Sequence, residues 1–142
     1  MSDPARDDAT GDRATRHAEG MAVRRQVLGD EHVDRAQQRT TGFTAPFQDF
    51  ITRYAWGEVW TGEEASKPQR SCLTLAILAA LGCEDEFAMH VRAALRNGVR
   101  PEDVREVLMH VAVYAGVPRA NRAFALADAV LAEHGAEAPD RR

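Results

Sequence analysis

The chain has 142 residues, of which 44% are hydrophobic, and a formal net charge of -4. This length predicts one domain, and the hydrophobic fraction is sufficient for a core. Arginine supplies nearly all of the positive charge, since Lys67 is the only lysine, and no basic cluster marks either end. This mildly acidic balance argues against nucleic acid as the main partner.

Targeting and membrane signals are missing from the sequence. No apolar run reaches the roughly 18 residues that a membrane span needs. The first 20 residues contain no apolar core of a secretory signal. Cys72 and Cys83 do not form the spacing pattern of a disulfide framework. We therefore expect a cytoplasmic protein with no membrane partner.

Helix signals recur along the chain, whereas the period-2 alternation of strands does not. We expect disordered tails over residues 1–14 and 135–142 and one helical domain over residues 15–134. The helices are predicted, in chain order, at about 14–28, 31–38, 45–54, 68–81, 84–96, 101–115 and 119–134, with a short turn or helix at 56–60. The predicted fold class is all-α, a single-domain bundle of six to eight helices.

A carboxylate and an imidazole are predicted to meet near the middle of the chain. An acidic turn, Cys83 to Glu86, follows a nearly uncharged helix, and His90 comes four residues after Glu86. On a helix this spacing places both side chains on one face, where the carboxylate can hold the ring and fix its tautomer. A lone histidine that faces inward is more often an ordinary core residue, so the pair alone leaves both interpretations open.

The helix predicted at 101–115 carries a second group of polar side chains. Glu106, His110 and Tyr114 recur every four residues beside the apolar face, and together they could form a site. The same pattern is typical of residues at the boundary of a core or interface.

An aromatic cluster and two arginines are candidates for ligand binding. Trp56 and Trp60 flank Glu58 in a chain that contains few aromatic residues. They could wall a pocket for a planar ligand, or they could plug a helix junction or subunit interface. Arg70 and Arg92 are candidate carboxylate binders, because guanidinium groups make bidentate contacts with carboxylates.

Metal and disulfide chemistry have weaker support. The sequence contains no HExxH motif, no paired CxxC motif and no close histidine pair, so we expect no metal site. Cys83 and Glu86 have the spacing of a CxxC motif whose second cysteine is replaced. Because a dithiol cycle needs two sulfurs, we interpret both cysteines as small buried residues.

Five segments between about Gly20 and Glu133, taken together, resemble the carboxymuconolactone decarboxylase family, within the superfamily that also contains alkylhydroperoxidase D-like proteins. These segments are GMAVRRQVLGDEHVDRA, TGFTAPFQDFITRYAWGEVW, QRSCLTLAILAALG, MHVRAALRNGV and VREVLMHVAVYAGVPRANRAFALA. The pieces RYAWGEVW and GVPRAN point to the decarboxylase branch, and His90 matches the family's histidine at the end of the acidic turn. Glu86 stands where the redox branch has its second cysteine, which argues against disulfide chemistry.

The resemblance implies an all-α fold, no cofactor and a ring-shaped homo-oligomer, commonly a trimer or hexamer. It also implies decarboxylation of 4-carboxymuconolactone to 3-oxoadipate enol-lactone in protocatechuate (aromatic) catabolism. The catalytic candidates are then His90, Glu86 and His110, and the substrate-binding candidates are Arg70, Arg92, Trp56, Glu58, Trp60 and Tyr114. Two alternatives stay open, namely a thiol-dependent peroxidase or reductase on the same fold and a non-catalytic oligomeric binder of small acids.

Overall fold

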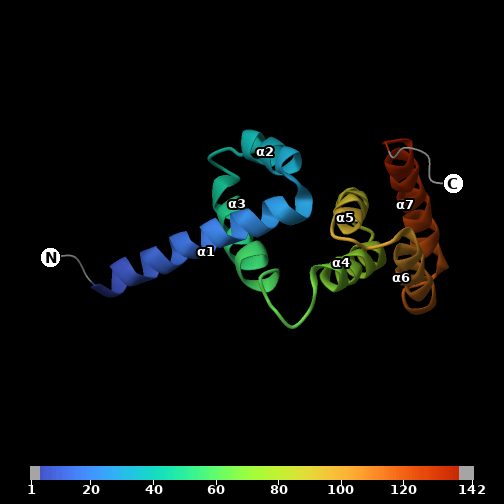
Figure 1. Cartoon of the computed structure of the whole chain (residues 1–142), viewed down its shortest axis with the longest axis horizontal. Coiled ribbons are helices and arrows are strands. Elements are labelled where there is room, and N and C mark those ends of the chain that lie inside the picture. Colours follow the sequence, from blue (N-terminus) through green and yellow to red (C-terminus); the bar gives the residue numbers. More distant parts are fainter. Residues whose placement is uncertain (1–3, 138–142) are drawn as a thin grey trace. The chain divides into compact units, whose positions relative to one another are not determined.

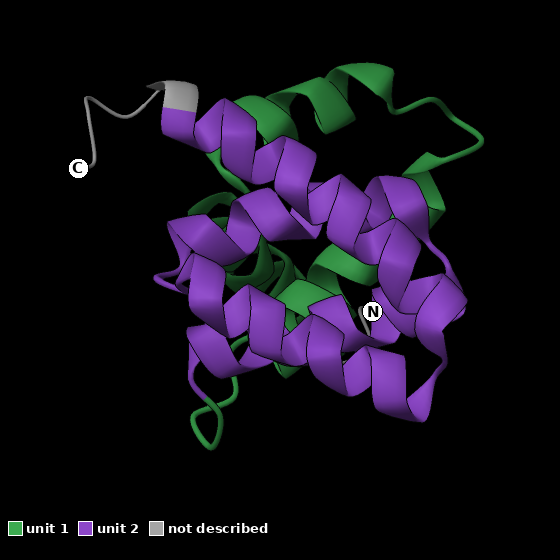
Figure 2. Cartoon of the chain, turned by 90° about the vertical axis from the view of Figure 1, so that its right-hand side faces the viewer, with its two compact units in different colours: residues 1–65 green, residues 66–142 purple. Residues whose placement is uncertain are grey.

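The computed structural model describes residues 4–137, and within this range it contains helices and no strands (Figure 1). The predicted all-α fold is therefore confirmed. The chain divides into two compact units, Met1–Ala65 and Ser66–Arg142, which Figure 2 shows in different colours.

Unit 1 contains three α-helices and one π-helix. They are α1 (Pro4–Leu28), α2 (Asp30–Arg39), α3 (Ala45–Ile51) and the π-helix η1 (Thr52–Val59).

The π-helix is a departure from the prediction. We expected an α-helix over 45–54 and a separate turn or helix over 56–60, whereas α3 continues directly into η1. The wider register is visible where the Trp60 amide donates to the carbonyl of Ala55, five residues earlier, at 2.9 Å. π-Helices are uncommon and are often found at functional sites.

Two glycines allow α1 and η1 to cross in backbone contact. A Cβ atom at Gly20 would overlap the Thr52 carbonyl oxygen, and one at Gly57 would lie 2.5 Å from the Arg16 carbonyl oxygen. No larger residue fits either position without moving a helix. This crossing fixes where η1 lies on α1 and therefore positions the side chains of η1.

Unit 2 is a bundle of four helices: α4 (Lys67–Leu81), α5 (Glu84–Arg96), α6 (Pro101–Tyr114) and α7 (Val117–Glu137). Their inward faces share one hydrophobic core, whose largest fully buried members are Leu75, Phe87, Val91, Val104 and Leu108.

Local signals fix the ends of α4. The Ser66 hydroxyl accepts from the Gln69 amide at 3.2 Å, and the Gln69 side chain accepts from the Ser66 amide at 2.8 Å, which is a complete capping box. At the other end Gly82 is left-handed, with φ 73°. The helices predicted in this unit are confirmed to within a few residues, and α5 has the predicted bounds.

The predicted tails differ from the structure where it describes them. α1 begins at Pro4, not near residue 14, and α7 continues to Glu137. Residues 4–14 and 135–137, which we predicted to be disordered, are therefore helical. The remainder of both predicted tails, residues 1–3 and 138–142, lies outside the described residues.

Candidate functional site

The predicted tryptophan pair forms in unit 1. The Trp56 and Trp60 rings lie with their centroids 5.1 Å apart and their planes tilted by 32°. Trp56 is buried, and Trp60 is half-buried. The pair therefore presents one anchored ring and one ring with an accessible surface.

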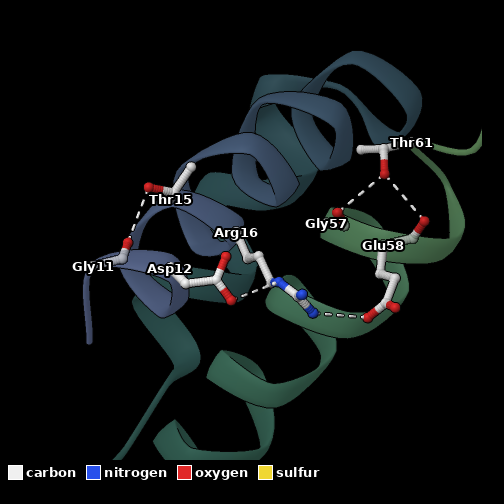
Figure 3. A network of polar contacts seen from close by, with 7 residues as sticks. All are labelled: Gly11, Asp12, Thr15, Arg16, Gly57, Glu58 and Thr61. Atoms are coloured by element: carbon white, nitrogen blue, oxygen red, sulfur yellow. Dashed lines mark hydrogen bonds and ion pairs between the residues drawn. The ribbon is translucent and has the colours of Figure 1, made fainter. Parts of the chain in front are cut away.

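Glu58, between the two tryptophans, is exposed and lies in an ion pair (Figure 3). Its Oε2 accepts from the Arg16 guanidinium of α1 at 3.1 Å, and Arg16 also contacts Asp12 at 3.3 Å. Nearby, the Thr61 hydroxyl donates to the carbonyls of Gly57 and Glu58 and closes the end of η1. Glu58 thus links α1 to η1 at the surface, where a single ion pair contributes little stability.

Glu86 and His90 both lie on α5 in unit 2. His90 is half-buried, and Phe87 and Val91 on the same helix are fully buried. Glu86 is exposed, and its carboxylate forms no hydrogen bond or ion pair with any described residue. No hydrogen bond joins the Glu86 carboxylate to the His90 ring among the described residues, so the predicted pairing stays a prediction. Their catalytic roles stay predictions.

The two candidate arginines of unit 2 differ in their surroundings. Arg92 is exposed and donates to Glu133 of α7 at 3.2 Å. Arg70 lies half-buried in the first turn of α4. The Arg92 guanidinium is thus paired with a carboxylate at the surface of unit 2.

The predicted polar edge of α6 is present. Glu106, His110 and Tyr114 are all exposed, and the His110 and Tyr114 rings lie 5.7 Å apart between centroids. Tyr114 is 83% exposed, so its phenol is available to a ligand or to another molecule. Their participation in a site stays a prediction.

Both cysteines are free thiols and half-buried. Burial raises the pKa of the Cys72 thiol, which makes it a poorer nucleophile at neutral pH. Among residues 4–137 no cluster of three His, Cys, Asp or Glu side chains could hold a metal ion. In the same range, none of the helices is both long and apolar enough to cross a membrane.

Sequence reasoning missed a buried cation in unit 1. Arg24 of α1 is 6% exposed and donates to the Thr52 hydroxyl at 3.2 Å and to the Gln48 side-chain carbonyl at 3.1 Å. Its Nε has no hydrogen-bond partner, and no carboxylate of a described residue pairs with it. Burial lowers the pKa of the guanidinium. Buried charges are ordinarily paired, so this cation is suited to an anionic ligand.

One signal could have identified Arg24. Gly20, Arg24 and Val27 lie at i, i+4 and i+7, which is one face of a helix, and all three are buried. An arginine in line with small and apolar residues indicates a buried guanidinium.

The comparisons with known proteins agree with the fold. Residues 45–129 match the family model described as the carboxymuconolactone decarboxylase family. The chain is 42% identical over 120 residues to a 4-carboxymuconolactone decarboxylase of Acinetobacter baylyi, covering 84% of this chain and 90% of that protein. It is also 42% identical over 113 residues to the nitrosuccinic acid decarboxylase npaB of Metarhizium robertsii, covering 78% of this chain and 79% of the relative.

A third relative, a 4-carboxymuconolactone decarboxylase of Pseudomonas putida, is 49% identical over 47 residues, which cover 33% of this chain and 98% of that sequence. The family model spans helices of both units and more than half of the chain. The chain belongs to the carboxymuconolactone decarboxylase family.

Proposed function

We propose that this chain decarboxylates 4-carboxymuconolactone to 3-oxoadipate enol-lactone, without a cofactor, in protocatechuate catabolism. The observation that carries the proposal is the identity of 42% to the Acinetobacter baylyi decarboxylase over nearly the full length of both proteins. A cytoplasmic location fits this metabolic role and the two free thiols.

The substrate can supply its own electron sink. Its ring carboxylate is on the saturated ring carbon next to the ring double bond, which is itself conjugated to the lactone carbonyl. When the bond to carbon dioxide breaks, the electron pair moves onto the lactone oxygen and gives a dienolate. Protonation at a ring carbon then gives the enol-lactone. The protein has to hold the dianion, stabilise the dienolate oxygen and deliver one proton.

His90 is the first choice for the group that donates to the lactone oxygen and carries the proton. It is half-buried, where a donor acts more strongly than in water, and Glu86 lies one helical turn away on the same face. Substrate binding could draw the Glu86 carboxylate toward the ring, because catalytic hydrogen bonds often tighten only in the complex. His110, Tyr114 and Glu58 rank below His90 as proton donors.

Cations should grip the acetate arm of the substrate and leave the departing carboxylate free. A salt bridge to the departing group would stabilise the ground state, since that charge is lost as the reaction proceeds. Arg70 and Arg92 are the candidates from the sequence, and Arg24 joins them because it is a buried cation without a carboxylate partner among the described residues. Trp56 and Trp60 would contact the flat ring and exclude water.

A homo-oligomer, commonly a trimer or hexamer in this family, is part of the proposal. Unit 2 exposes a row of large apolar side chains on α4 and a second row on α6. These side chains are Leu73, Ile77 and Leu81 on α4, and Met109, Val113 and Tyr114 on α6, each of them more than half exposed. Exposed apolar rows of this kind indicate surfaces that another subunit covers.

A second candidate function is decarboxylation of a different small acid. The relative named for nitrosuccinic acid is as similar to this chain as the first relative, at 42% identity. A nitro group, like a conjugated lactone carbonyl, can accept the electron pair that carbon dioxide leaves behind. The proposed proton donor would serve both reactions, so the arginines and tryptophans would decide the substrate.

The test is a coupled absorbance assay on the purified full chain. 4-Carboxymuconolactone is made in place from protocatechuate by the two upstream enzymes, and release of carbon dioxide is followed above the spontaneous rate. Acceleration that requires neither added metal nor thiol supports the proposal. If only the decarboxylation of nitrosuccinic acid is accelerated, that acid would replace 4-carboxymuconolactone as the proposed substrate. Turnover of peroxide that alkylation of Cys83 abolishes would favour the thiol peroxidase, and binding without turnover would favour the small-acid binder.

A further inference from the structure

A small pocket within unit 2 opens between the end of α4 and the beginnings of α5 and α7. Its volume is about 210 Å³, below the roughly 300 to 1,000 Å³ of sites for drug-sized ligands. Most of its wall is apolar, and the charged side chains that line it are Glu84, Arg119 and Arg122. None of the candidate site residues named above lines this pocket.

Arg119 supplies a second cation beside Glu84, whose carboxylate is close enough for its charge to be felt. The Arg119 side chain forms no hydrogen bond or close ion pair with any residue of the described part of the chain. Its guanidinium lies against Gly82, where a Cβ atom would overlap it. Because Gly82 has no side chain, the Arg119 guanidinium can occupy this space beside the pocket.

The positive charge of Arg122 is paired with a carboxylate. Arg122 makes a bidentate pair with Glu84, with Nε to Oε1 at 3.0 Å and one terminal nitrogen to Oε2 at 3.2 Å. The hydrogen bond from Arg122 lowers the pKa of Glu84, so the carboxylate is charged at neutral pH. Two guanidinium groups and one carboxylate leave the pocket with one net positive charge.

The helix directions add to this positive potential. Both α5, of 13 residues, and α7, of 21 residues, begin at the pocket, since Glu84 and Arg119 lie in their first turns. A helix N-terminus carries a partial positive charge. An apolar wall, a net positive charge and two helix N-termini together favour a ligand that combines an apolar body with a negative end.

We propose that this pocket binds a small monocarboxylic acid with a compact apolar body, of about the size of benzoate. The carboxylate pairs with Arg119 and shares Arg122 with Glu84, while the apolar body lies against Leu78, Phe87 and Leu126. The proposal does not depend on the decarboxylase function, because it concerns other side chains and is measured by binding alone.

The test is a titration of the full chain, with ¹³C-labelled leucine methyl groups, using benzoate and its neutral analogue benzamide. Leu78 and Leu126 line the pocket, whereas Leu108 lies in the core and serves as an internal reference. Benzoate should shift the two pocket residues with a Kd of about millimolar, as expected for so small a ligand. Equal shifts with benzamide, or no shift with benzoate, would overturn the proposal.

Arg119→Gln removes the guanidinium that has no hydrogen-bonded carboxylate and should weaken benzoate binding by about tenfold or more. Its matched control is Arg105→Gln, which removes an exposed arginine of α6 outside the pocket and should leave the Kd unchanged. Glu84→Gln removes the competing carboxylate and should tighten binding by roughly threefold or more. Unchanged binding in Arg119→Gln would show that the pocket does not recognise the carboxylate.

Two glycines provide a second matched pair. Gly82→Ala would push the Arg119 guanidinium aside, whereas Gly98→Ala introduces a side chain at a similar positive φ, 92°, with open space around it. We expect loss of benzoate binding in the first variant and retention in the second. His90→Gln should bind benzoate as the parent chain does. Benzoate binding therefore tests the pocket even if His90 turns out to have no catalytic role.

Discussion

The backbone of Gly20 in α1 lies directly against the carbonyl oxygen of Thr52 in η1, with no space for a side chain between them. Gly20→Ala should therefore force the helices apart and destabilise the protein by about 1–3 kcal/mol, the usual cost of overpacking. Urea denaturation, followed by tryptophan fluorescence, measures the change, because Trp56 and Trp60 both lie in η1 or at its end.

Gly11→Ala is the control for Gly20→Ala. Gly11 lies on the same helix, and a Cβ atom there meets nothing within 4 Å. Alanine should raise the stability slightly, by up to about 1 kcal/mol, because glycine is a poor helix former. Equal stabilisation by both substitutions would mean that α1 and η1 are not in backbone contact.

His90→Gln should retain the fold and the oligomer and lower turnover of 4-carboxymuconolactone by roughly 10²-fold or more, the usual contribution of a general acid or base. Glutamine preserves a hydrogen-bonding side chain and cannot carry the proton. Measurement of kcat and KM separately is required, since a loss confined to KM would assign His90 to binding. Near-normal kcat would remove His90 from the proton-transfer role.

Arg70→Gln should raise KM more than Arg92→Gln does. Arg92 is exposed and pairs with Glu133, whereas Arg70 is half-buried, where a charge-assisted contact with a carboxylate is stronger. We expect an increase of about tenfold for Arg70→Gln and of less than about twofold for Arg92→Gln. A larger increase of KM in Arg92→Gln would mean that Arg92, on the surface of α5, binds the acetate arm of the substrate.

His32 of α2 should make unit 1 less stable in mild acid. Burial, followed by the nearby charges of Arg35, Arg24 and Arg39, lowers the pKa of His32 from its ordinary value of 6.5. Above that value the ring is neutral in both states. As the pH falls below it, the unfolded chain takes up the proton first, so the free energy of unfolding decreases.

His32→Gln should therefore reduce the loss of Tm between about pH 7.5 and 5.5, a range that spans the ordinary histidine pKa. His134→Gln, which changes an exposed histidine of α7, is the control and should leave the pH dependence as it is. An unchanged Tm loss in His32→Gln would show that other groups cause the acid sensitivity.

The exposed apolar rows of unit 2 predict the effect of a charge on assembly. Val113 of α6 is 75% exposed, and Val113→Lys should give a smaller species in light scattering coupled to gel filtration, because a charge is costly in an apolar interface. Ala129→Lys adds the same charge at an exposed position of α7 outside both rows and should leave the assembly intact. A parent chain that is already monomeric would contradict the proposed homo-oligomer.

The sequence predicted those features that depend on local signals. Pro68 in the first turn and Gly82 at the other end lie within a few bonds of the helix ends that they mark, so α4 could be predicted closely. The beginning of α1 was placed too late, because the polar composition of residues 4–14 is typical of a disordered tail.

Features that depend on distant residues could not be predicted in this way. The crossing of α1 and η1 brings Gly20 against the backbone of Thr52, more than 30 residues away along the chain. The charge balance of the pocket depends on Arg122 reaching Glu84 across a separation of 38 residues. The i, i+4 spacing of Glu86 and His90 was correct as a pattern, yet it did not determine whether the two side chains touch.

The π-helix also constrains the number of residues in segment 52–59, independently of which residues they are. A π-turn contains about one residue more than an α-turn, so deletion of one residue would allow this segment to close as an α-helix. Each residue of an α-helix turns the chain by about 100°, so residues three apart, like those four apart, lie on one face of the helix. A deletion between Trp56 and Trp60 would therefore keep the two rings on one side, whereas an insertion there would turn Trp60 away from Trp56 and divide the aromatic surface.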